Sequence, residues 1–402
     1  MNRKEFLKVC GILGISLPFT TAINACEKDE NITPRTINSL NKVLIIGAGP
    51  AGMSAGYLLA QQGIDFQILE ALPTYGGRIK HNTTFTDFPI PLGAEWMHVA
   101  NSGNHILSEV VNDSAVNVAT KTQGYDLRKD TSGYFDGSNL EVDRLGNHFG
   151  NDFADKKFIG SSWLRFFETY VLPRVQSKIV YNTPIVAIDY ASDQVVVTAQ
   201  DGKIYATDKV IVSVPVKILQ SEMIEFKPSL PASKQRAIRD IKVWGGFKAF
   251  FKFTNQFYPT YLSFPNSASP QGQLHYYNAA YAQHTSDHIL GLFSTGKPAE
   301  PYQQLSGNAQ RDYILGELDT IFGNKIASSS YIDHIVQNWN EEPYARGAYV
   351  TAYENGRQVR TLGQSVNNKL YFAGDAYTTG NDWSSVHAAA RSARRAVDEL
   401  IQ

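Results

Sequence analysis

The sequence predicts an α/β fold in which both ends of the chain build one parallel-sheet domain and an α+β domain lies between them. Three observations support this prediction. A buried strand runs into a glycine-rich turn at 43–52, an apolar strand precedes an alanine-rich helix at 370–396, and aromatic, strand-like segments lie in between. With 402 residues, 43% of them hydrophobic, the chain is long enough for two cored domains.

Composition excludes several classes of function. The net charge of -1 comes from 37 Lys and Arg against 38 Asp and Glu, so no bulk charge attracts nucleic acid and no nucleic-acid partner is expected. The 2 cysteines, Cys10 and Cys26, both lie in the first thirty residues. We therefore expect no disulfide, no thiolate nucleophile and no cysteine metal ligand in the folded body. No metal site is predicted.

The first 26 residues have the pattern of an export signal peptide. Basic residues precede an apolar stretch, Val9–Ala25, which Pro18 interrupts, so it is too short and too broken for a comfortable membrane span. The alternative is a weakly amphipathic N-terminal segment. Residues 27–41 are polar and are predicted to form a flexible tether.

Two resemblances sharpen the export prediction. Ile23–Cys26 resembles a bacterial lipobox, in which Cys26 becomes the lipidated first residue of the mature chain. Arg3-Lys4 and its neighbours are similar to a twin-arginine signal, with Lys4 where the second arginine is usual, so either export route is open. These resemblances imply a lipoprotein of the cell envelope, anchored in a membrane through Cys26 on the periplasmic side or the outer surface.

The folded body begins with a dinucleotide-binding pattern. Val43–Ile46 is typical of a strand buried on both faces, and the glycines that follow permit a tight turn, a close approach to a pyrophosphate and close helix packing. The helix after this turn would aim its amides at phosphates. Phe66–Leu69 is the second predicted strand, and the acid that ends it suits ribose hydroxyls. The predicted contacts are Gly47, Gly49, Pro50, Ala51, Gly52 and Glu70.

Two further stretches decide between a nicotinamide and a flavin. Tyr75–Arg78 supplies two glycines and an arginine that can pair with a phosphate, and Leu370–Asp375 is an apolar strand that leads into the alanine-rich helix. A nicotinamide site needs no such distant strand and helix, whereas the long FAD molecule does, so FAD is the predicted cofactor. The contacts predicted here are Gly76, Gly77, Arg78, Gly374, Asp375, Ser385 and Val386.

These segments, in this order, resemble the flavin-containing amine oxidases, a family that includes monoamine oxidases, polyamine oxidases and flavin histone demethylases. The resemblance covers nearly everything from residue 42 to 402. Its remaining motifs are Leu92–His98, Thr183–Ile188, Lys209–Pro215 and Glu342–Tyr349.

The resemblance implies a discontinuous, Rossmann-like FAD-binding domain of the glutathione-reductase type, built from 42–100, 176–243 and 345–402. The substrate domain would be α+β and take 101–175 and 244–344. Its Gly246–Phe253 and Leu274–Tyr277 suit strands at an aromatic pocket, although ordinary sheet core explains most of these aromatics. In the first domain, Gln194–Ala199 and Lys203–Ala206 flank Asp201-Gly202, a hairpin signal. The family places further cofactor contacts at Gly93, Ala94, Glu95, Trp96 and, through its backbone, Val186.

The implied chemistry is the oxidation of a small-molecule amine. A hydride passes to flavin N5, the imine hydrolyses, and O2 (giving H2O2) or another acceptor reoxidises the flavin. Tyr349 matches the aromatic wall beside the flavin and is the predicted catalytic residue. Ala348 stands where monoamine oxidases carry a flavin-linked cysteine, so non-covalent FAD is expected. Glu95 either attracts a cationic amine or accepts backbone hydrogen bonds.

One departure from the family leaves the electron acceptor open. The family usually holds a water at flavin N5 with a lysine of the substrate domain, but no lysine occurs between Lys252 and Lys297, where Gln283 and His284 are the nearby polar residues. The protein is therefore an oxidase or a dehydrogenase. The alternatives are an L-amino-acid oxidase, which would need an arginine such as Arg128 or Arg165 for the carboxylate, a desaturase, or a flavin-binding protein without amine oxidase activity.

Overall fold

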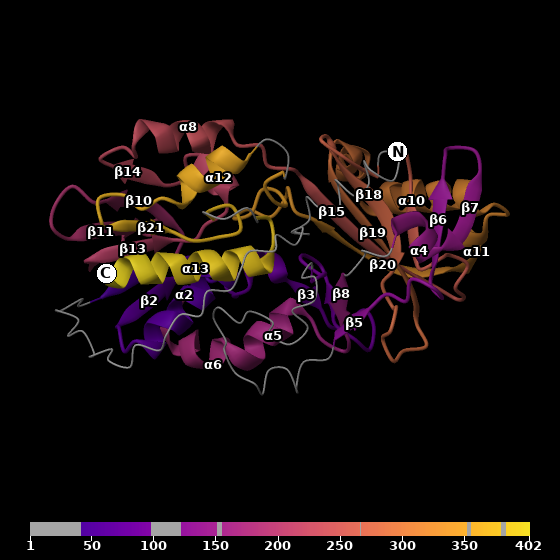
Figure 1. Ribbon diagram of the computed structural model, residues 1–402, viewed down its shortest axis with the longest axis horizontal. Helices are drawn as coiled ribbons and strands as arrows, with labels where there is room; N and C mark the ends of the chain where they lie inside the picture. Colours follow the sequence, from indigo (N-terminus) through magenta and orange to yellow (C-terminus); the bar gives the residue numbers. More distant parts are fainter. Residues whose placement is uncertain (1–41, 98–121, 151–154, 266, 352–354, 379–382) are drawn as a thin grey trace, which may run out of the picture.

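The computed structural model describes residues 42–97, 122–150, 155–265, 267–351, 355–378 and 383–402. The predicted signal peptide, the tether and His98 lie outside the described residues. Two bodies lie side by side along the long axis, with α2 and α13 in one and β15, β18, β19 and β20 in the other (Figure 1). Within the described part of the chain, no helix has the length and apolar character needed to cross a membrane.

A five-stranded parallel sheet forms the centre of the first body. Its strand order is β21-β13-β1-β2-β9, and it joins segments that lie far apart in the sequence. The prediction that the first strand is buried on both faces is confirmed, because Val43 and Ile45 enter one hydrophobic core while Leu44 and Ile46 enter the other. The strands are β1 (Val43–Ile46), β2 (Phe66–Leu69), β9 (Ile179–Val180), β13 (Lys209–Val212) and β21 (Leu370–Phe372).

Small residues let two helices pack closely on one face of this sheet. Helix α2 (Pro50–Gln61) and helix α13 (Val386–Ile401) contact one another, and the buried alanines of α13 share a core with Ala51 and Ala55 of α2. The alanine-rich C-terminal segment is thus the helix that the sequence predicts. Its position beside α2 brings the two ends of the folded body together (Figure 1).

Part of the range predicted as substrate domain packs against the first body. Residues 101–175 were expected to belong to the substrate domain, but helices α5 (Trp163–Tyr170) and α6 (Leu172–Val175) bury Trp163, Phe167 and Val175 in the core that contains α2 and α13. Helix α5 is amphipathic, and α6 packs against α2. Residues 163–175 therefore share the core of the first body.

A four-stranded sheet, in the order β12-β11-β10-β14, covers the opposite face of the parallel sheet together with helices α7, α8 and α12. The predicted hairpin is confirmed, since β11 and β12 pair antiparallel across Gly202, whose φ of 86° favours glycine. The elements are β10 (Ile185–Asp189), β11 (Val195–Ala199), β12 (Ile204–Thr207), β14 (Glu225–Lys227), α7 (Val216–Gln220), α8 (Ala232–Asp240) and α12 (Gly356–Gly363).

The second body is built on a larger sheet in the order β20-β15-β19-β18-β16-β6-β7, with β17 paired to β18. One face packs on helix α10 (Gly307–Phe322) and buries Phe247, Phe251 and Tyr276, and the other face turns toward the first body. The predicted α+β class is confirmed. The strands are β6 (Thr131–Phe135), β7 (Leu140–Arg144), β15 (Gly246–Phe253), β16 (Tyr261–Ser263), β17 (Ala268–Ser269), β18 (Gly272–Asn278), β19 (His288–Gly296) and β20 (Tyr331–Asn338).

Short elements complete the two bodies. The hairpin of β3 and β4 carries the chain from Arg78 toward Glu95, and β5 pairs with β8. Helices α9 and α11 flank α10, and α4 follows β7. Their bounds are β3 (His81–Asn82), β4 (Ile90–Pro91), β5 (Thr122–Gly124), β8 (Lys156–Phe158), α4 (Leu145–Phe149), α9 (Glu300–Gln303) and α11 (Ile326–Ser330).

Candidate active site

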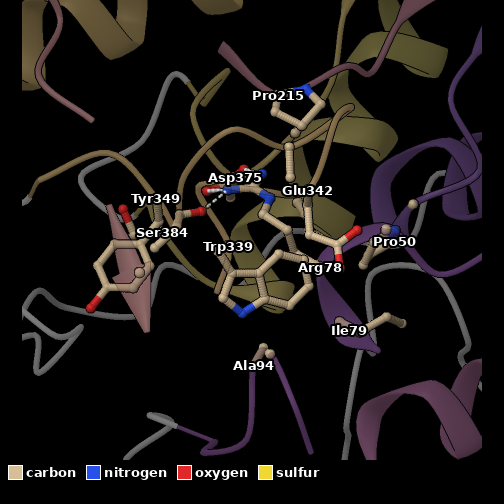
Figure 2. A pocket seen from close by; sticks show the side chains of 18 of the residues that line it. Pro50, Arg78, Ile79, Ala94, Pro215, Trp339, Glu342, Tyr349, Asp375 and Ser384 are labelled. Atoms are coloured by element: carbon tan, nitrogen blue, oxygen red, sulfur yellow. Dashed lines mark hydrogen bonds and ion pairs between the residues drawn. The ribbon is translucent and has the colours of Figure 1, made fainter. Parts of the chain in front are cut away.

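A cavity of about 320 Å³ lies between the two bodies. One wall comes from the turns after β1 and β2, from the segment around Arg78 and from the segment between β21 and α13. The opposite wall is the inward face of the large sheet. Figure 2 shows Arg78 and Asp375 on the first wall and Tyr349 where the two walls meet.

The glycine turn after β1 is shaped to receive a ligand. A side chain at Gly52 would place its Cβ 1.9 Å from the carbonyl oxygen of Gly47, whereas the space beside Gly49 is open. Gly49 is the N-cap of α2 and, having no side chain, leaves the first amides of the helix uncapped. Gly47, Gly49, Pro50 and Ala51 line the cavity. Free amides, a helix dipole and an open backbone together fit a pyrophosphate.

Glu70 fixes this turn from the next strand. Its Oε2 accepts a hydrogen bond from the amide of Ala48 at 2.6 Å, and its Oε1 accepts one from the amide of Leu72 at 2.9 Å. Burial raises the pKa of the Glu70 carboxyl, and these amide bonds oppose the rise. Each oxygen keeps a lone pair, and the residue lines the cavity. This geometry agrees with the ribose contact expected from the sequence.

Arg78 and Asp375 are joined in one ion pair, although the sequence suggested two separate cofactor contacts. The Nη2 of Arg78 lies 2.5 Å from Oδ1 of Asp375, and its Nη1 donates to Oδ2 at 3.3 Å and to the carbonyl oxygen of Ala348 (Figure 2). In this structure its guanidinium pairs with a protein carboxylate, and the phosphate contact expected from the sequence stays a prediction. The pair ties the N-terminal and C-terminal halves of the wall together.

The C-terminal helix begins at the cavity. Ser385 is its N-cap, and its hydroxyl accepts a hydrogen bond from the amide of Ala388 at 3.0 Å. Gly374 has a φ of +159°, and a side chain there would press on Tyr377. Gly374, Asp375, Ser385 and Val386 all line the cavity.

The other predicted cofactor residues divide into lining and supporting positions. Gly77, Gly93, Ala94, Glu95 and Trp96 line the cavity, whereas Gly52 and Gly76 lie behind its surface. A Cβ at Gly93 would come within 1.8 Å of the Arg78 carbonyl oxygen, so the close approach of these two segments requires glycine there. Val186 does not line the cavity and its side chain is exposed on β10; the neighbouring Thr183, Pro184 and Ile185 line it instead.

Glu95 is buried within the protein and interacts with three side chains. Lys157 contacts its Oε1 at 2.9 Å, while Lys248 and the Tyr277 hydroxyl contact its Oε2 at 2.7 and 2.5 Å. Burial alone would raise the pKa of Glu95, but the two lysines and the tyrosine hold it at about 2. The partners found for Glu95 are side chains, two of them lysines that already balance its charge. We call these four residues the Glu95 cluster.

The inward face of the large sheet forms a floor, for which the sequence predicted strands at an aromatic pocket but no individual site residues. Gln273 and His275 of β18 pair with Thr295 and Phe293 of β19, and all four line the cavity. Lys248 of β15 and Tyr261 of β16 complete the sheet floor. The period-2 alternation of β18 does predict that Gln273, His275 and Tyr277 share a face, but only the pairing of strands shows that this face meets the cofactor wall.

Tyr349 stands at the edge of this floor. Its hydroxyl donates to Oε1 of Gln273 at 2.6 Å, and its ring lies 6.0 Å from that of Trp244. The hydroxyl of Thr295, beside Gln273, is buried without a hydrogen-bond partner among the described residues. A ligand in this corner would meet an aromatic wall.

Gln283 and His284 do not replace the family lysine, because neither lines the cavity. The Gln283 side chain accepts from the amide of Gly160 and donates to the carbonyl of Phe158. The described residues also contain no group of three His, Cys, Asp or Glu that could hold a metal ion.

Comparisons with known proteins agree with this geometry. The model of the family described as "Flavin containing amine oxidoreductase" matches residues 167–401, and that of an "NAD(P)-binding Rossmann-like domain" matches 45–113. The chain therefore belongs to the flavin-containing amine oxidoreductase family. It is a flavin-dependent oxidoreductase, FAD is its cofactor, and the glycine turn, Glu70 and the start of α13 are the residues that would hold FAD.

Individual relatives are distant but cover nearly the whole chain. Polyamine oxidase 1 of Zea mays is 25% identical over 458 residues, covering 90% of both chains. Probable polyamine oxidase 4 of Arabidopsis thaliana is 21% identical and covers 93% of this chain and 88% of its own. The structure of wild-type putrescine oxidase bound to putrescine superposes with a TM-score of 0.70 at 16% identity, over 90% of this chain and 98% of that one. At this identity the structural match establishes the fold.

Proposed function

We propose that the protein oxidises an amine at the carbon beside nitrogen and releases an imine that hydrolyses in water. The non-covalent FAD would supply the hydride acceptor, at N5. The protein residues would bind the amine, exclude water and orient it. The observation that carries the proposal is the cavity itself, in which a wall suited to a dinucleotide faces a floor of aromatic and polar side chains.

The floor suits the form of the substrate that can react. An amine must be uncharged to give up a hydride, and an aromatic, poorly hydrated site favours the uncharged form. Tyr349, Tyr261 and Phe293 supply such surroundings. We propose Tyr349 as the residue that shapes the wall against which the reacting carbon lies.

The names of the relatives indicate which amines to test first. Polyamine oxidases and a putrescine oxidase are among them, so diamines and polyamines are the leading candidates, followed by aromatic and aliphatic monoamines. An L-amino-acid oxidase is disfavoured: Arg128 and Arg165 do not line the cavity, and Arg78, the arginine that does so in the described part of the chain, is paired with Asp375.

The proposal for the electron acceptor rests on Lys248, the lysine that lines the cavity in the described part of the chain. Its three N–H groups go to the carbonyls of Pro91 and Gly93 and to Glu95, at 2.7, 3.3 and 2.7 Å. An ammonium has three donors, so none is left to hold a water. We propose that reoxidation by O2 is slow and that another acceptor takes the electrons.

An anaerobic titration of the purified holoprotein tests the function. Bleaching of the flavin absorption by one class of amine supports amine oxidation, and amino acids and alcohols serve as controls. Air is then admitted and the return of the absorption is timed by stopped flow. A flavin that no amine bleaches would instead favour a desaturase or a binding protein without amine oxidase activity.

For location, we propose the cell envelope, with a lipid on Cys26 as the anchor. The support is the lipobox-like sequence alone. In the full chain, Cys26→Ala should move the protein from the membrane fraction to the soluble fraction after cell lysis. Retention in the membrane fraction would contradict the anchor.

A further inference from the structure

His275 is the polar residue of the sheet floor that the proposed function leaves unexplained. It lies near the middle of β18, between Gln273 and Tyr277 on the same face of the strand, and it lines the cavity. The sequence predicts Leu274–Tyr277 as a strand at an aromatic pocket, but it assigns no role to His275, which belongs to none of the family motifs.

Aromatic packing fixes the plane of the imidazole. The ring stacks between Tyr261 at 4.9 Å and Phe293 at 4.7 Å, with interplanar angles of 22° and 23°. Trp96 approaches in an edge geometry at 5.6 Å. Because both faces of the imidazole are covered, its polar atoms can meet a partner only at the ring edge.

The imidazole has hydrogen-bonding capacity that the protein does not use. Within the part of the chain that the structure describes, no hydrogen bond is formed by its ring nitrogens, although Gln273 and Tyr277 on the same strand both have partners. A neutral imidazole carries one donor and one acceptor. A polar ring left without a partner in an aromatic site is costly unless a ligand or a water supplies one.

The neighbouring charges favour an uncharged ligand at this position. Lys248 on β15 and Glu95 on the segment after β4 are the charged groups that act on His275, and Tyr261 and Tyr277 are its titratable ring neighbours. The Glu95 cluster holds two lysines against one carboxylate, so positive charge is in excess behind Trp96 and Tyr277. That excess opposes an ammonium and leaves an uncharged N–H as the better partner.

We propose that the imidazole of His275 accepts a hydrogen bond from an N–H of the uncharged amine and so positions the substrate over the sheet floor. The inference rests on the proposed function, since it names the residue that recognises the reacting nitrogen. His275 acts as a positioning residue and not as a base. Burial, followed by the charge of Lys248, lowers the pKa of His275 to about 3. An imidazole with this pKa is too weak a base to take a proton from an ammonium with a pKa of about 10.

A binding experiment tests this independently of turnover. The holoprotein is titrated with cumylamine, an amine with no hydrogen on the carbon beside nitrogen, at pH 9, and binding is followed by the change in flavin absorption. His275→Phe keeps a stacked ring but removes both nitrogens, and the loss of one hydrogen bond should raise Kd about tenfold. His275→Gln retains an acceptor and should stay within about threefold of the wild type.

A matched control separates recognition from packing. His334→Phe is the same substitution at another stacked histidine of the same sheet, 5.1 Å from the ring of Phe251 and away from the cavity. It should leave Kd unchanged. Equal binding by wild type and His275→Phe, equal weakening by His334→Phe, or no saturable binding to the wild type would each overturn the proposal. Amine oxidation fails separately, when amines that do carry such a hydrogen leave the flavin unbleached.

Discussion

The two walls of the cavity are built in different ways. The cofactor wall is made mainly of backbone: the glycines and free amides at the start of α2, the chain around Gly93 and the start of α13. The sheet floor is made of side chains, and His275, Phe293 and Tyr261 come from three different strands. One wall depends on where the backbone can pass, and the other depends on which side chains the strand register places together.

This difference predicts which substitutions affect cofactor binding and which affect substrate binding. A backbone wall that receives a pyrophosphate suits any dinucleotide, and a substitution there should remove the cofactor. A floor of side chains can change its residues without changing the fold, and substitutions there should alter substrate binding while FAD stays bound. The Glu95 cluster is the exception, because it joins the two walls across the buried edge of the cavity.

The largest effect is expected at that junction. Glu95→Gln would leave Lys157 and Lys248 buried without a counter-charge, and breaking such a pair costs about 3–5 kcal/mol. The free energy of unfolding, measured by urea denaturation, should fall by that amount. The double variant Glu95→Gln/Lys157→Met removes one of the two charges and should recover part of the loss. A loss below about 1 kcal/mol would show that the junction does not hold the walls together.

The next effect tests the backbone wall. Gly52→Ala would set a methyl group 1.9 Å from the Gly47 carbonyl oxygen, so α2 or the turn must move. We expect a loss of about 1–3 kcal/mol in stability and most of the bound FAD, because the displaced amides no longer face the pyrophosphate. The ratio of flavin to protein absorption measures this directly.

The matched control for Gly52→Ala is Gly316→Ala in helix α10, where a Cβ meets nothing within 4 Å. Alanine is the better helix former there, so this variant should be as stable as the wild type or more stable by about 1 kcal/mol. Full FAD content in Gly52→Ala would contradict the view that the backbone of the cofactor wall binds FAD.

The cofactor wall could be predicted from the sequence almost residue by residue. Val43–Ile46, the glycine turn and Glu70 are contiguous or separated by one helix, so local patterns reveal their geometry. Contacts of this wall with residues far away in the chain could not be predicted from the sequence. Arg78 binds Asp375, almost three hundred residues on, and α5 and α6 complete the core under α2, which no local pattern indicates.

The sheet floor could not be predicted in the same way. Gly246–Phe253 and Leu274–Tyr277 were predicted as strands, and they are strands. However, a one-residue change of register would have turned His275 toward α10 and Tyr276 toward the cavity. The register of β18 against β19 decides which way His275 faces, and this register depends on contacts distributed over the whole sheet. The sequence alone therefore does not show that His275 faces the cavity.

A change of pH sharpens the comparison, because the floor holds a histidine and, among the described residues, the cofactor wall does not. The pKa of His275 is lowered to about 3, so the unfolded chain takes up a proton below about pH 6.5 that the folded protein refuses. The stability contributed by the neutral imidazole is complete above pH 6.5 and is lost as the pH falls. Glu95 acts in the same direction, but only below its ordinary pKa of 4.5.

The measurement compares wild type with His275→Gln by urea denaturation at pH 7.5 and pH 5. The wild type should lose about 1–2 kcal/mol more than the variant over this interval. His81 and His334, whose pKa values burial also lowers, are present in both proteins and cancel in the difference. Parallel loss in the two proteins would show that His275 is already protonated in the folded state at pH 5.

The smallest effect is expected where the two walls meet, at Tyr349. Tyr349→Phe keeps the aromatic wall but removes the hydroxyl that donates to Gln273 at 2.6 Å. One hydrogen bond of this kind is worth about 1 kcal/mol, so kcat/KM for the best amine should fall about fivefold while FAD content is unchanged. In Gln273→Leu the hydroxyl loses the same acceptor. Adding Tyr349→Phe to that variant should therefore have almost no further effect, because the two residues act through one contact. If the double variant instead shows the product of the two single effects, Tyr349 and Gln273 contact the substrate separately, and the wall and the floor recognise the amine independently.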